Sequence, residues 1–488
     1  MRMNNRAKVF LSTAIMALGT VCPVGGAFAV DSAFRVRAGQ RQLFLDDQGV
    51  AGIEHLKRTM HQPKKRGVVL RPDIPSDGWG FRTYTAPMWD PQENIHKIVY
   101  AAIKEWKDGS TRVGSALAVS KDGLNWQKPI LGLVDVDGSK QNNRIAVPPL
   151  RVGAELVNVI YDPDDPDPSR RYKGLQGTIG RVPVVSPDCI HWRALDVEPL
   201  PSSDVSFLSF DRDENRFFAL LKVSNQYGRA FSISISEDFE HWTKPRFIFG
   251  ADARDQQIAP KFIRRRLARP GRQHLFTWVD PDPATGWEKP PEYQRTWVSD
   301  CYNFALFPYE GLYMALPMIY YSVGQDWDTG EPVNTDGFHH IRLAMSRDLV
   351  DWKQLGDRQP FIEPSGTEQG LAGVYDRSQL GPAAPIVKGD ELWFYYSGCK
   401  RRCNHLLRLN PDRSRRDPAT LTAEERADLA EGLKAICLAV LRRDGFVSLD
   451  AGEQEGTIQT ESFMLPGSTL FVNVDAPKGE LRVDVLDG

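Results

Sequence analysis

The chain has 488 residues, of which 41% are hydrophobic and 25% charged, and its formal net charge is −2. Acidic and basic residues are interspersed, so the charge gives no basis for binding nucleic acid or an anionic surface. The chain is longer than one ordinary domain, although all-β domains are often large.

The first 29 residues have the features of a secretory signal peptide. Three basic residues precede an apolar stretch over 9–21, and Ala27-Phe-Ala29 offers small residues for cleavage. The apolar stretch is shorter than the roughly 20 residues that a membrane span needs, so cleavage is favoured over an anchor. No other segment of the sequence could span a membrane. We therefore predict a secreted or periplasmic protein.

Five cysteines remain after residue 29, and this odd number excludes a complete disulfide framework. Cys399 and Cys403 lie close enough in sequence for a local bridge or half of a metal site. Because only His405 is near them, two thiols or one bridge are favoured over a metal.

A phrase with the spacing S-x-D-x-x-x-W, here called the blade phrase, occurs four times, each behind apolar or small residues. The copies begin at Ser120, Ser186, Ser236 and Ser346, and a degenerate fifth copy over 439–446 keeps the Asp and loses the Trp. Repeats at such intervals are typical of solenoids and propellers. Because the phrase recurs in each unit, we interpret it as a structural turn whose Trp packs between blades.

In chain order, region 42–72 predicts a closing strand or an arm that crosses a propeller face. Five units follow, and most combine extended segments with a turn rich in Asp, Asn or Pro, as in a four-stranded blade. These units cover 82–127, 156–192, 205–242, 301–352 and 379–441.

Two insertions interrupt the later blades. The fourth blade phrase comes 110 residues after the third (346 − 236), so loops such as 280–294 must lie on one face. In blade five, residues 422–433 have a Thr-x-x-Glu cap and helix-forming residues, which predict a helix. Both insertions leave the all-β class unchanged.

After Asp444 the pattern changes to short alternating strands, expected at 457–463, 470–474 and 481–486. Three strands make a marginal domain, so this part either packs on the propeller or is a truncated module. The sequence therefore predicts an all-β protein: a signal peptide over 1–29, a five-bladed β-propeller over 30–445 and a β-sandwich-like segment over 446–488.

Carboxylates at the heads of the first strands are the candidate catalytic groups. Glu155 and Asp204 each lie seven residues before the turn Asp of their blade, and Asp300 heads the corresponding strand of blade four. First strands surround the channel of a propeller, so these side chains should converge there. Close carboxylates push their pKa values apart, as an acid and base pair requires. Turn formation alone also selects Asp and Glu, which leaves a purely structural role open.

Other side chains extend this candidate site. Asp47 belongs to an adjacent pair of carboxylates in the N-terminal region and is a further catalytic candidate. Aromatic faces stack on sugar rings, although core packing is the alternative for each of them. The expected substrate-binding residues are Arg82, Tyr84, Tyr302, Trp297 and Asp376.

The plan of five blades with blade phrases resembles the clan of propeller glycoside hydrolases that includes families 32 and 43. Four stretches, LFLDD, SKDGLNWQKPILGLVDVDGSKQNN, DCYNFALFPYEGLYMALP and SRDLVDWKQLGDRQPF, are similar to a group of bacterial secreted family 32-like proteins. The resemblance covers nearly all of the chain after the leader. It implies the propeller fold and an activity on carbohydrate.

The sequence departs from the catalytic motifs of family 32. Where the family usually has W-x-N-D-P-N-G, R-D-P and E-C, this chain has Met88-Trp-Asp90-Pro, Tyr161-Asp162-Pro163 and Ser299-Asp300-Cys301. Asp90 is thus a second candidate nucleophile, but its hairpin position, shared with Asp162, indicates a structural role. Fructosidase chemistry is therefore not implied.

The leading hypothesis is a secreted glycoside hydrolase that cleaves a poly- or oligosaccharide with axial carboxylates as acid, base or nucleophile. The alternatives are a carbohydrate-binding propeller without activity, and a phosphorylase or lyase on the same fold. No cofactor is expected. Ca²⁺ stays open because carboxylates and carbonyls suit it, but no loop has a recognisable calcium-binding spacing.

Overall fold

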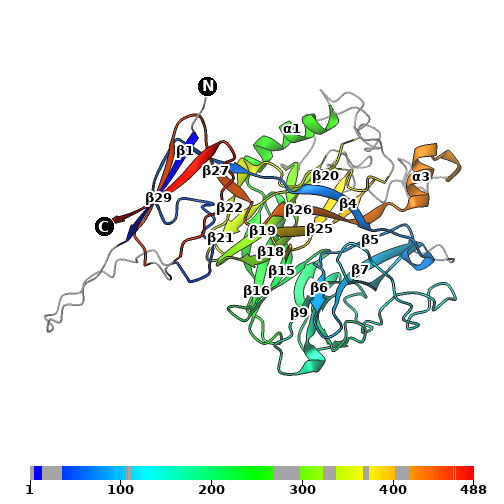
Figure 1. Ribbon diagram of the computed structural model, residues 1–488. Helices are drawn as coiled ribbons and strands as arrows, with labels where there is room; N and C mark the ends of the chain where they lie inside the picture. Colours follow the sequence, from blue (N-terminus) through cyan, green and yellow to red (C-terminus); the bar gives the residue numbers. More distant parts are fainter. Residues whose placement is uncertain are drawn as a thin grey trace. The chain divides into compact units, whose positions relative to one another are not determined.

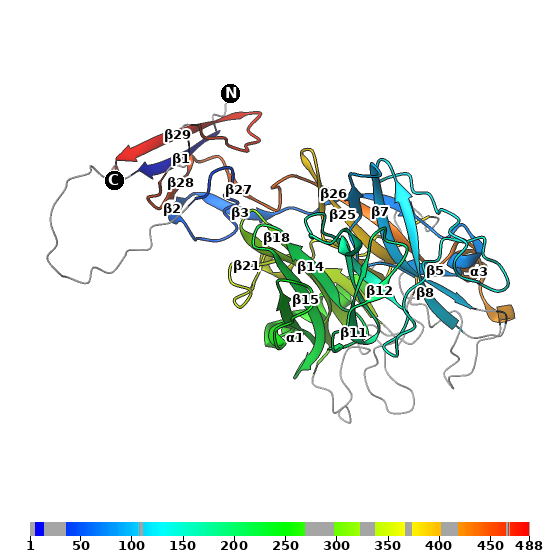
Figure 2. The ribbon, with the colours of Figure 1, turned by 90° about the horizontal axis from the view of Figure 1, so that it is seen from below.

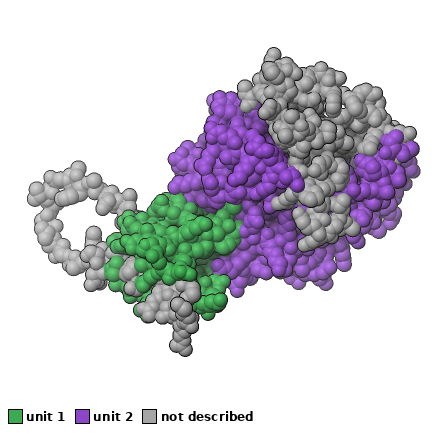
Figure 3. All heavy atoms as spheres, turned by 90° about the horizontal axis from the view of Figure 1, so that it is seen from above, with its two compact units in different colours: residues 1–61, 444–488 green, residues 62–443 purple. Residues whose placement is uncertain are grey.

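The computed structural model describes residues 5–13, 36–105, 107, 111–268, 297–322, 337–366, 373–401, 418–464, 467 and 469–487. The chain folds as two compact units, coloured in Figure 3. Unit 1 comprises Met1–His61 and Asp444–Gly488, and unit 2 comprises Gln62–Arg443. Strands dominate the described residues, which confirms the predicted all-β class.

Unit 2 consists of five blades of antiparallel strands (Figures 1 and 2). Blade one contains β5 (Gly80–Arg82), β6 (Met88–Asp90), β7 (Ile95–Glu105) and β8 (Thr111–Ser120). Blade two contains β9 (Leu156–Tyr161), β10 (Tyr172–Gln176), β11 (Ile179–Ser186), β12 (Arg193–Ala194) and β13 (Leu200–Ser203). Blade three contains β14 (Phe207–Asp211), β15 (Arg216–Asn225), β16 (Gly228–Ser236) and β17 (Arg246–Gly250).

The last two blades follow the same plan. Blade four contains β18 (Ser299–Tyr309), β19 (Leu312–Ser322), β20 (Gly337–Ile341), β21 (Ala344–Ser346) and β22 (Lys353–Gln354). Blade five contains β23 (Gln379–Pro382), β24 (Ile386–Lys388), β25 (Glu391–Cys399), β26 (Lys434–Arg442) and β4 (Lys64–Leu70). The five predicted blades are therefore all present.

Strand β4 closes the ring, because it comes first in unit 2 but pairs antiparallel with β26, the last strand of the unit. Gly80 of β5 also pairs with Lys434 of β26, which joins blade one to blade five. The predicted closing strand thus lies at 64–70. The LFLDD stretch, 43–47, forms no strand and belongs to unit 1, so this part of region 42–72 is not the closing strand. Closure covers sheet edges that would otherwise be open to other chains.

Apolar side chains from neighbouring blades form shared layers between the sheets. Trp126 of blade one packs edge-on against Tyr395 of blade five, with ring centroids 6.3 Å apart. Trp192 of blade two belongs to a buried cluster with Val99 and Leu117 of blade one. The prediction that the Trp of the blade phrase packs between blades is confirmed at these positions.

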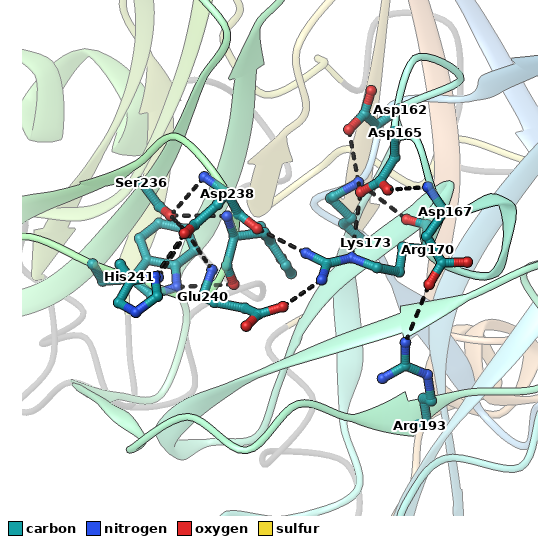
Figure 4. A network of polar contacts seen from close by, with 12 residues as sticks. Asp162, Asp165, Asp167, Arg170, Lys173, Arg193, Ser236, Asp238, Glu240 and His241 are labelled. Carbon is teal, nitrogen blue, oxygen red and sulfur yellow. Dashed lines mark hydrogen bonds and ion pairs between the residues drawn. The ribbon is translucent and has the colours of Figure 1, made fainter.

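The polar residues of the blade phrase form a repeated turn. In all four copies the Ser hydroxyl donates to the Asp carboxylate at 2.9–3.1 Å. Backbone N–H groups two and three residues after the Asp donate to the same carboxylate oxygen. Figure 4 shows the blade-three copy beside blade two, where Arg170 donates to the carbonyl oxygen of Asp238 at 2.7 Å. The phrase is a structural turn, as the repetition indicates.

Removing the Ser hydroxyl from one of these turns should lower the stability of the protein by a small but measurable amount. Ser186 is fully buried and its oxygen accepts the backbone N–H of Cys189 at 2.9 Å. We expect Ser186→Ala to lower the free energy of unfolding by about 1–3 kcal/mol, because a buried donor loses its acceptor. Urea denaturation measures the change. The exposed Ser139→Ala variant is the control and should stay within about 0.5 kcal/mol of the parent protein.

Two α-helices are described in unit 2. Helix α3 (Ala423–Glu431) begins at Thr422 with a capping box to Glu425, which confirms the predicted helix. Helix α1 (Ala253–Leu267) was not expected; it begins with a capping box between Asp252 and Asp255 and contains Pro260. The sequence signal was the D-x-x-D spacing, which Pro260 obscured. The predicted loop 280–294 lies outside the described residues.

Four short 3₁₀ helices complete the described elements: Pro75–Asp77, Pro168–Arg170, Gly356–Arg358 and Pro418–Thr420. In the described part of the chain, no helix is both long and apolar enough to cross a membrane.

Unit 1 contains a four-stranded sheet with the order β2-β28-β1-β29 and a two-stranded sheet of β3 and β27. The bounds of its strands are Asn5–Thr13 (β1), Val50–Glu54 (β2), Leu56–Met60 (β3), Val447–Ala451 (β27), Gly456–Thr460 (β28) and Gly479–Asp487 (β29). Residues 36–61 thus belong with the C-terminal segment and not with the propeller. Residues 470–474 form no strand, which corrects that expectation. Strand β1 falls within the segment expected to be a leader, and its removal stays a prediction.

Candidate functional site

The first strands of the blades contact one another around unit 2: β9 lies against β14, β14 against β18 and β18 against β23. Glu155 immediately precedes β9, Asp204 precedes β14, and Asp300 is the second residue of β18. Arg82 is the last residue of β5. These four residues come from blades one to four. Electrostatic interactions connect the blades, because the charge of Arg82 interacts with Asp204 and with Tyr302. We call the side chains described in the next paragraphs the axial cluster.

The first pair of the axial cluster joins blade one to the head of β9. Arg82 Nε and Nη2 donate to the two carboxylate oxygens of Glu155 at 3.1 and 2.7 Å. Such two-point geometry is the strongest that a guanidinium and a carboxylate can form. The Glu155 side chain is only 7% exposed, so its charge is enclosed in this pair.

The second pair lies at the head of β14. Lys222 Nζ, from the middle of β15, is 3.0 Å from Asp204 Oδ2, and the Tyr302 hydroxyl also bonds to Asp204. Burial would raise the pKa of Asp204, but Lys222 and Arg82 outweigh it and hold this pKa well below its usual value. The Asp204 side chain is 43% exposed, so this carboxylate is both ionised and open to solvent.

The backbone at Asp204 has φ 53°, in the left-handed region that few residues other than glycine adopt. Such conformations are more frequent at functional sites than elsewhere, because surrounding structure must hold them. The carbonyl oxygen of Asp204 accepts from Arg181, and its N–H donates to the carbonyl of Thr178 at 2.8 Å. The head of β14 is therefore fixed on both sides.

The third pair lies largely out of solvent, with the Arg229 side chain 14% exposed. Arg229 of β16 donates from Nε and Nη2 to the Asp300 oxygens at 2.6 and 2.8 Å, and its backbone N–H adds a third bond at 3.2 Å. Asp300 is 0% exposed. Gly228, with φ 93°, lets the β15–β16 hairpin approach, because a Cβ there would lie 2.9 Å from Asp300 Oδ2. Asp300 is thus enclosed by its partners.

A fourth cation, Arg181 of β11, has no carboxylate partner among the residues that the structure describes. It donates to the Ser206 hydroxyl at 2.5 Å and to the carbonyl oxygens of Gly180 and Asp204. Burial lowers the pKa of Arg181 to about 10; Glu155 and Asp204 oppose the shift and Arg82 adds to it. Arg181 is 1% exposed, so the cluster encloses a guanidinium that only neutral groups contact.

Aromatic rings surround the same groups. Lys222 Nζ lies 4.0 Å and the guanidinium carbon of Arg229 4.4 Å from the ring centroid of Tyr302. The Tyr302 ring also contacts His339, with centroids 5.1 Å apart. Tyr84 is buried, and burial raises its pKa well above the usual range. Trp297 lies against Gly228, on the side where Gly228 approaches Asp300.

Two further predicted site residues have partners outside the axial cluster. Asp47 belongs to unit 1, where its carboxylate is 81% exposed and pairs with Arg58 at 2.7 Å, whereas the axial cluster is built from unit 2. Asp376 is buried and binds Lys65 of β4 at 2.7 Å and the Tyr396 hydroxyl at 2.9 Å. Lys65 is part of the closing strand, so these contacts tie β4 to blade five.

Asp90 is enclosed by neighbouring side chains, which agrees with the structural role that its hairpin position indicates. It is fully buried and bonds to Lys97 Nζ at 3.1 Å and to the Tyr172 hydroxyl at 2.5 Å. Asp162 has the same kind of partner, Lys173, at 2.7 Å. These turn carboxylates with a buried lysine are structural.

Sequence reasoning missed Lys222, Arg181 and Arg229. Each is a charged residue within or beside an apolar strand segment, as in Phe217-Phe-Ala-Leu-Leu-Lys222-Val. Lys and Arg are rarely buried without a partner, so a cation at such a position is a detectable signal. Each of the three strand-head carboxylates pairs with a cation at hydrogen-bonding distance and not with another carboxylate.

The described residues contain no group of three or more His, Cys, Asp or Glu side chains suited to hold a metal ion. Cys189, Cys301 and Cys437 are buried thiols, and burial raises the pKa of each. Cys403 and His405 lie outside the described residues, so the local bridge stays a prediction. A cavity of about 330 Å³ lies away from the cluster, between β4 and residues 373–375, with Tyr375 and Glu431 in its lining.

No protein-family model matches the sequence, and no curated protein matches it either. Solved structures do match. A glycosyl hydrolase from Bacteroides ovatus is 11% identical with a TM-score of 0.40, over 78% of this chain and 93% of that one. The catalytic domain of a Coprinopsis cinerea GH62 alpha-L-arabinofuranosidase is 10% identical with a TM-score of 0.41, over 78% and 97%. The Bombyx mori GH32 beta-fructofuranosidase is 8% identical with a TM-score of 0.39, over 81% and 65%. At these identities and scores, the likeness does not assign catalytic residues.

Proposed function

We propose that this protein is a secreted or periplasmic glycoside hydrolase whose reactive carboxylate is Asp204. The observation that supports this role is that Asp204, alone among the three strand-head carboxylates, is open to solvent while Lys222 and Arg82 keep it ionised. An ionised, accessible carboxylate can act as the nucleophile at a sugar carbon or as the base that activates water. Tyr302 and Lys222 position it.

Glu155 and Asp300 are assigned a supporting role in this proposal. Each is held by two hydrogen bonds from one arginine side chain and lies out of solvent. Their charge fixes Arg82 and Arg229 around the Asp204 carboxylate and the Tyr302 ring. With these two carboxylates held by arginine, the candidate acid in the described cluster is Lys222, whose pKa of about 8 allows it to release a proton.

A carbohydrate-binding propeller without activity is the second candidate. It is favoured by one observation, namely that two of the three carboxylates are already neutralised by arginine. Retaining and inverting glycosidases alike usually need two carboxyl groups with different roles. In this second function the exposed edge of the cluster binds a glycan through hydrogen bonds and the Tyr302 and Trp297 rings.

A panel of plant, algal and bacterial glycans incubated with the protein separates these functions. The proposal expects new reducing ends from at least one glycan. Affinity without any product supports the binding function and contradicts hydrolysis. A strict requirement for phosphate indicates a phosphorylase, and a product that absorbs in the ultraviolet indicates a lyase; either result also contradicts hydrolysis.

A further inference from the structure

The charges of the axial cluster do not balance. Three carboxylates pair with three cations: Glu155 with Arg82, Asp204 with Lys222, and Asp300 with Arg229. Arg181 is the fourth cation, and its donors reach only a hydroxyl and two carbonyl oxygens. Among the described residues, these four positive and three negative groups leave an excess of one positive charge.

This excess charge is costly where it lies. An isolated ion in a protein interior loses its hydration, and proteins normally pair it or neutralise it. The pKa of Arg181, about 10, is still above neutral pH, so this guanidinium keeps its charge. Burial, with a contribution from Arg229, also lowers the pKa of Lys222 to about 8, although Asp204 opposes the shift. Two cations of the cluster are therefore destabilised by their surroundings, and an added negative charge would relieve both.

The cluster also presents unused donors to an incoming group. Arg82 binds Glu155 through Nε and Nη2 only, and no hydrogen bond to a described residue uses its Nη1. The Arg82 side chain is 22% exposed, and Asp204 beside it is open to solvent. The free edge of a guanidinium is planar and suits the two oxygens of an oxyanion.

We propose that the substrate is an acidic glycan, and that a singly charged oxyanion on the sugar, a uronate carboxylate or a sulfate ester, binds at Arg82 Nη1 within the field of Arg181. This inference rests on the proposed function, because it assigns a substrate class to the same site. One negative charge on the ligand equals the excess of one positive charge in the cluster. A neutral sugar would leave that excess uncompensated.

The experiment compares each acidic polysaccharide with a matched neutral form. Uronic acid polymers are tested beside their carboxyl-reduced derivatives, and sulfated polymers beside their desulfated derivatives, with the full protein and with both affinity and product measured. We expect one acidic class to bind at least about tenfold more tightly than its neutral form, equivalent to about 1.4 kcal/mol. The carboxylate and sulfate arms identify the oxyanion.

Two variants test the role of Arg82. Arg82→Gln/Glu155→Gln removes both charges of the pair together, so that Glu155 is not left unpaired, and it should abolish the preference for the acidic form. Arg193→Gln removes a cation at an exposed position and should keep the preference. Calorimetry measures the affinity of both variants for the acidic and neutral glycans, and thermal denaturation checks that both variants are folded.

The outcomes for the two proposals are distinct. Equal affinity for acidic and neutral forms overturns the inference, and product from neutral glycans would then leave hydrolysis intact. Tight binding of an acidic glycan without product supports the inference and contradicts hydrolysis. A preference that survives in a folded Arg82→Gln/Glu155→Gln variant overturns the assignment of the oxyanion to Arg82.

Discussion

Asp300→Ala is expected to lower the free energy of unfolding by about 3–5 kcal/mol, because removing one partner of a buried ion pair leaves the other charge unpaired. The group that loses its carboxylate is Arg229, which bonds to Asp300 through Nε, Nη2 and its backbone N–H. As a candidate catalytic carboxylate, Asp300 would instead be expected to lose activity on substitution without unfolding the protein. The complete burial of Asp300 changes that expectation. Urea denaturation followed by circular dichroism measures the loss.

A double variant provides the matched control. Asp300→Leu/Arg229→Met replaces both charges by apolar side chains, so it should recover most of the stability that Asp300→Ala loses. A single Asp300→Ala variant that keeps its full stability but loses turnover would contradict the structural role. Asp300 would then be a catalytic group.

Asp204→Asn should have the opposite profile, with folding preserved and turnover lost. Removing a group that transfers a proton or attacks the sugar costs about 10²–10⁴-fold in rate. Folding should survive because Asp204 is partly exposed, and because Lys222, with a pKa of about 8, can release its proton when the counter-charge is gone. A change of one unit in the pKa of Lys222 corresponds to about 1.4 kcal/mol, so we expect the free energy of unfolding to change by an amount of this order.

The control for Asp204→Asn is Asp213→Asn, which changes an exposed carboxylate in the β14–β15 turn of the same blade. Its turnover should equal that of the parent protein. Steady-state rates on an active glycan, at equal concentrations of folded protein, make the comparison. Full turnover by Asp204→Asn would show that the reactive group lies elsewhere.

Much of the fold could be predicted from local patterns. The blade phrase identifies four of the blades because one turn, with the same Ser–Asp hydrogen bond, recurs where β8, β11, β16 and β21 end. Helix α3 was predictable from its capping box. The strand pairing of residues 36–61 could not be predicted in this way. Strands β2 and β3 pair with strands about 400 residues away, and no local pattern specifies such a partner.

Only the carboxylates of the candidate site could be predicted from the sequence. Register along the first strands placed Glu155, Asp204 and Asp300 together because propeller geometry repeats. Their partners come from second and third strands, such as Lys222 on β15, which the register argument did not include. Asp47 belongs to unit 1 and these three carboxylates to unit 2, and the adjacency of two carboxylates in sequence says nothing of the unit to which they belong.

The most direct test of the central claim is to form the product in water enriched in heavy oxygen. Hydrolysis at the axial cluster predicts one heavy oxygen at each new reducing end, seen by mass spectrometry, with a rate that falls by about 10²–10⁴-fold in Asp204→Asn. Product without heavy oxygen, or labelled product formed at the parent rate by Asp204→Asn, would contradict the account.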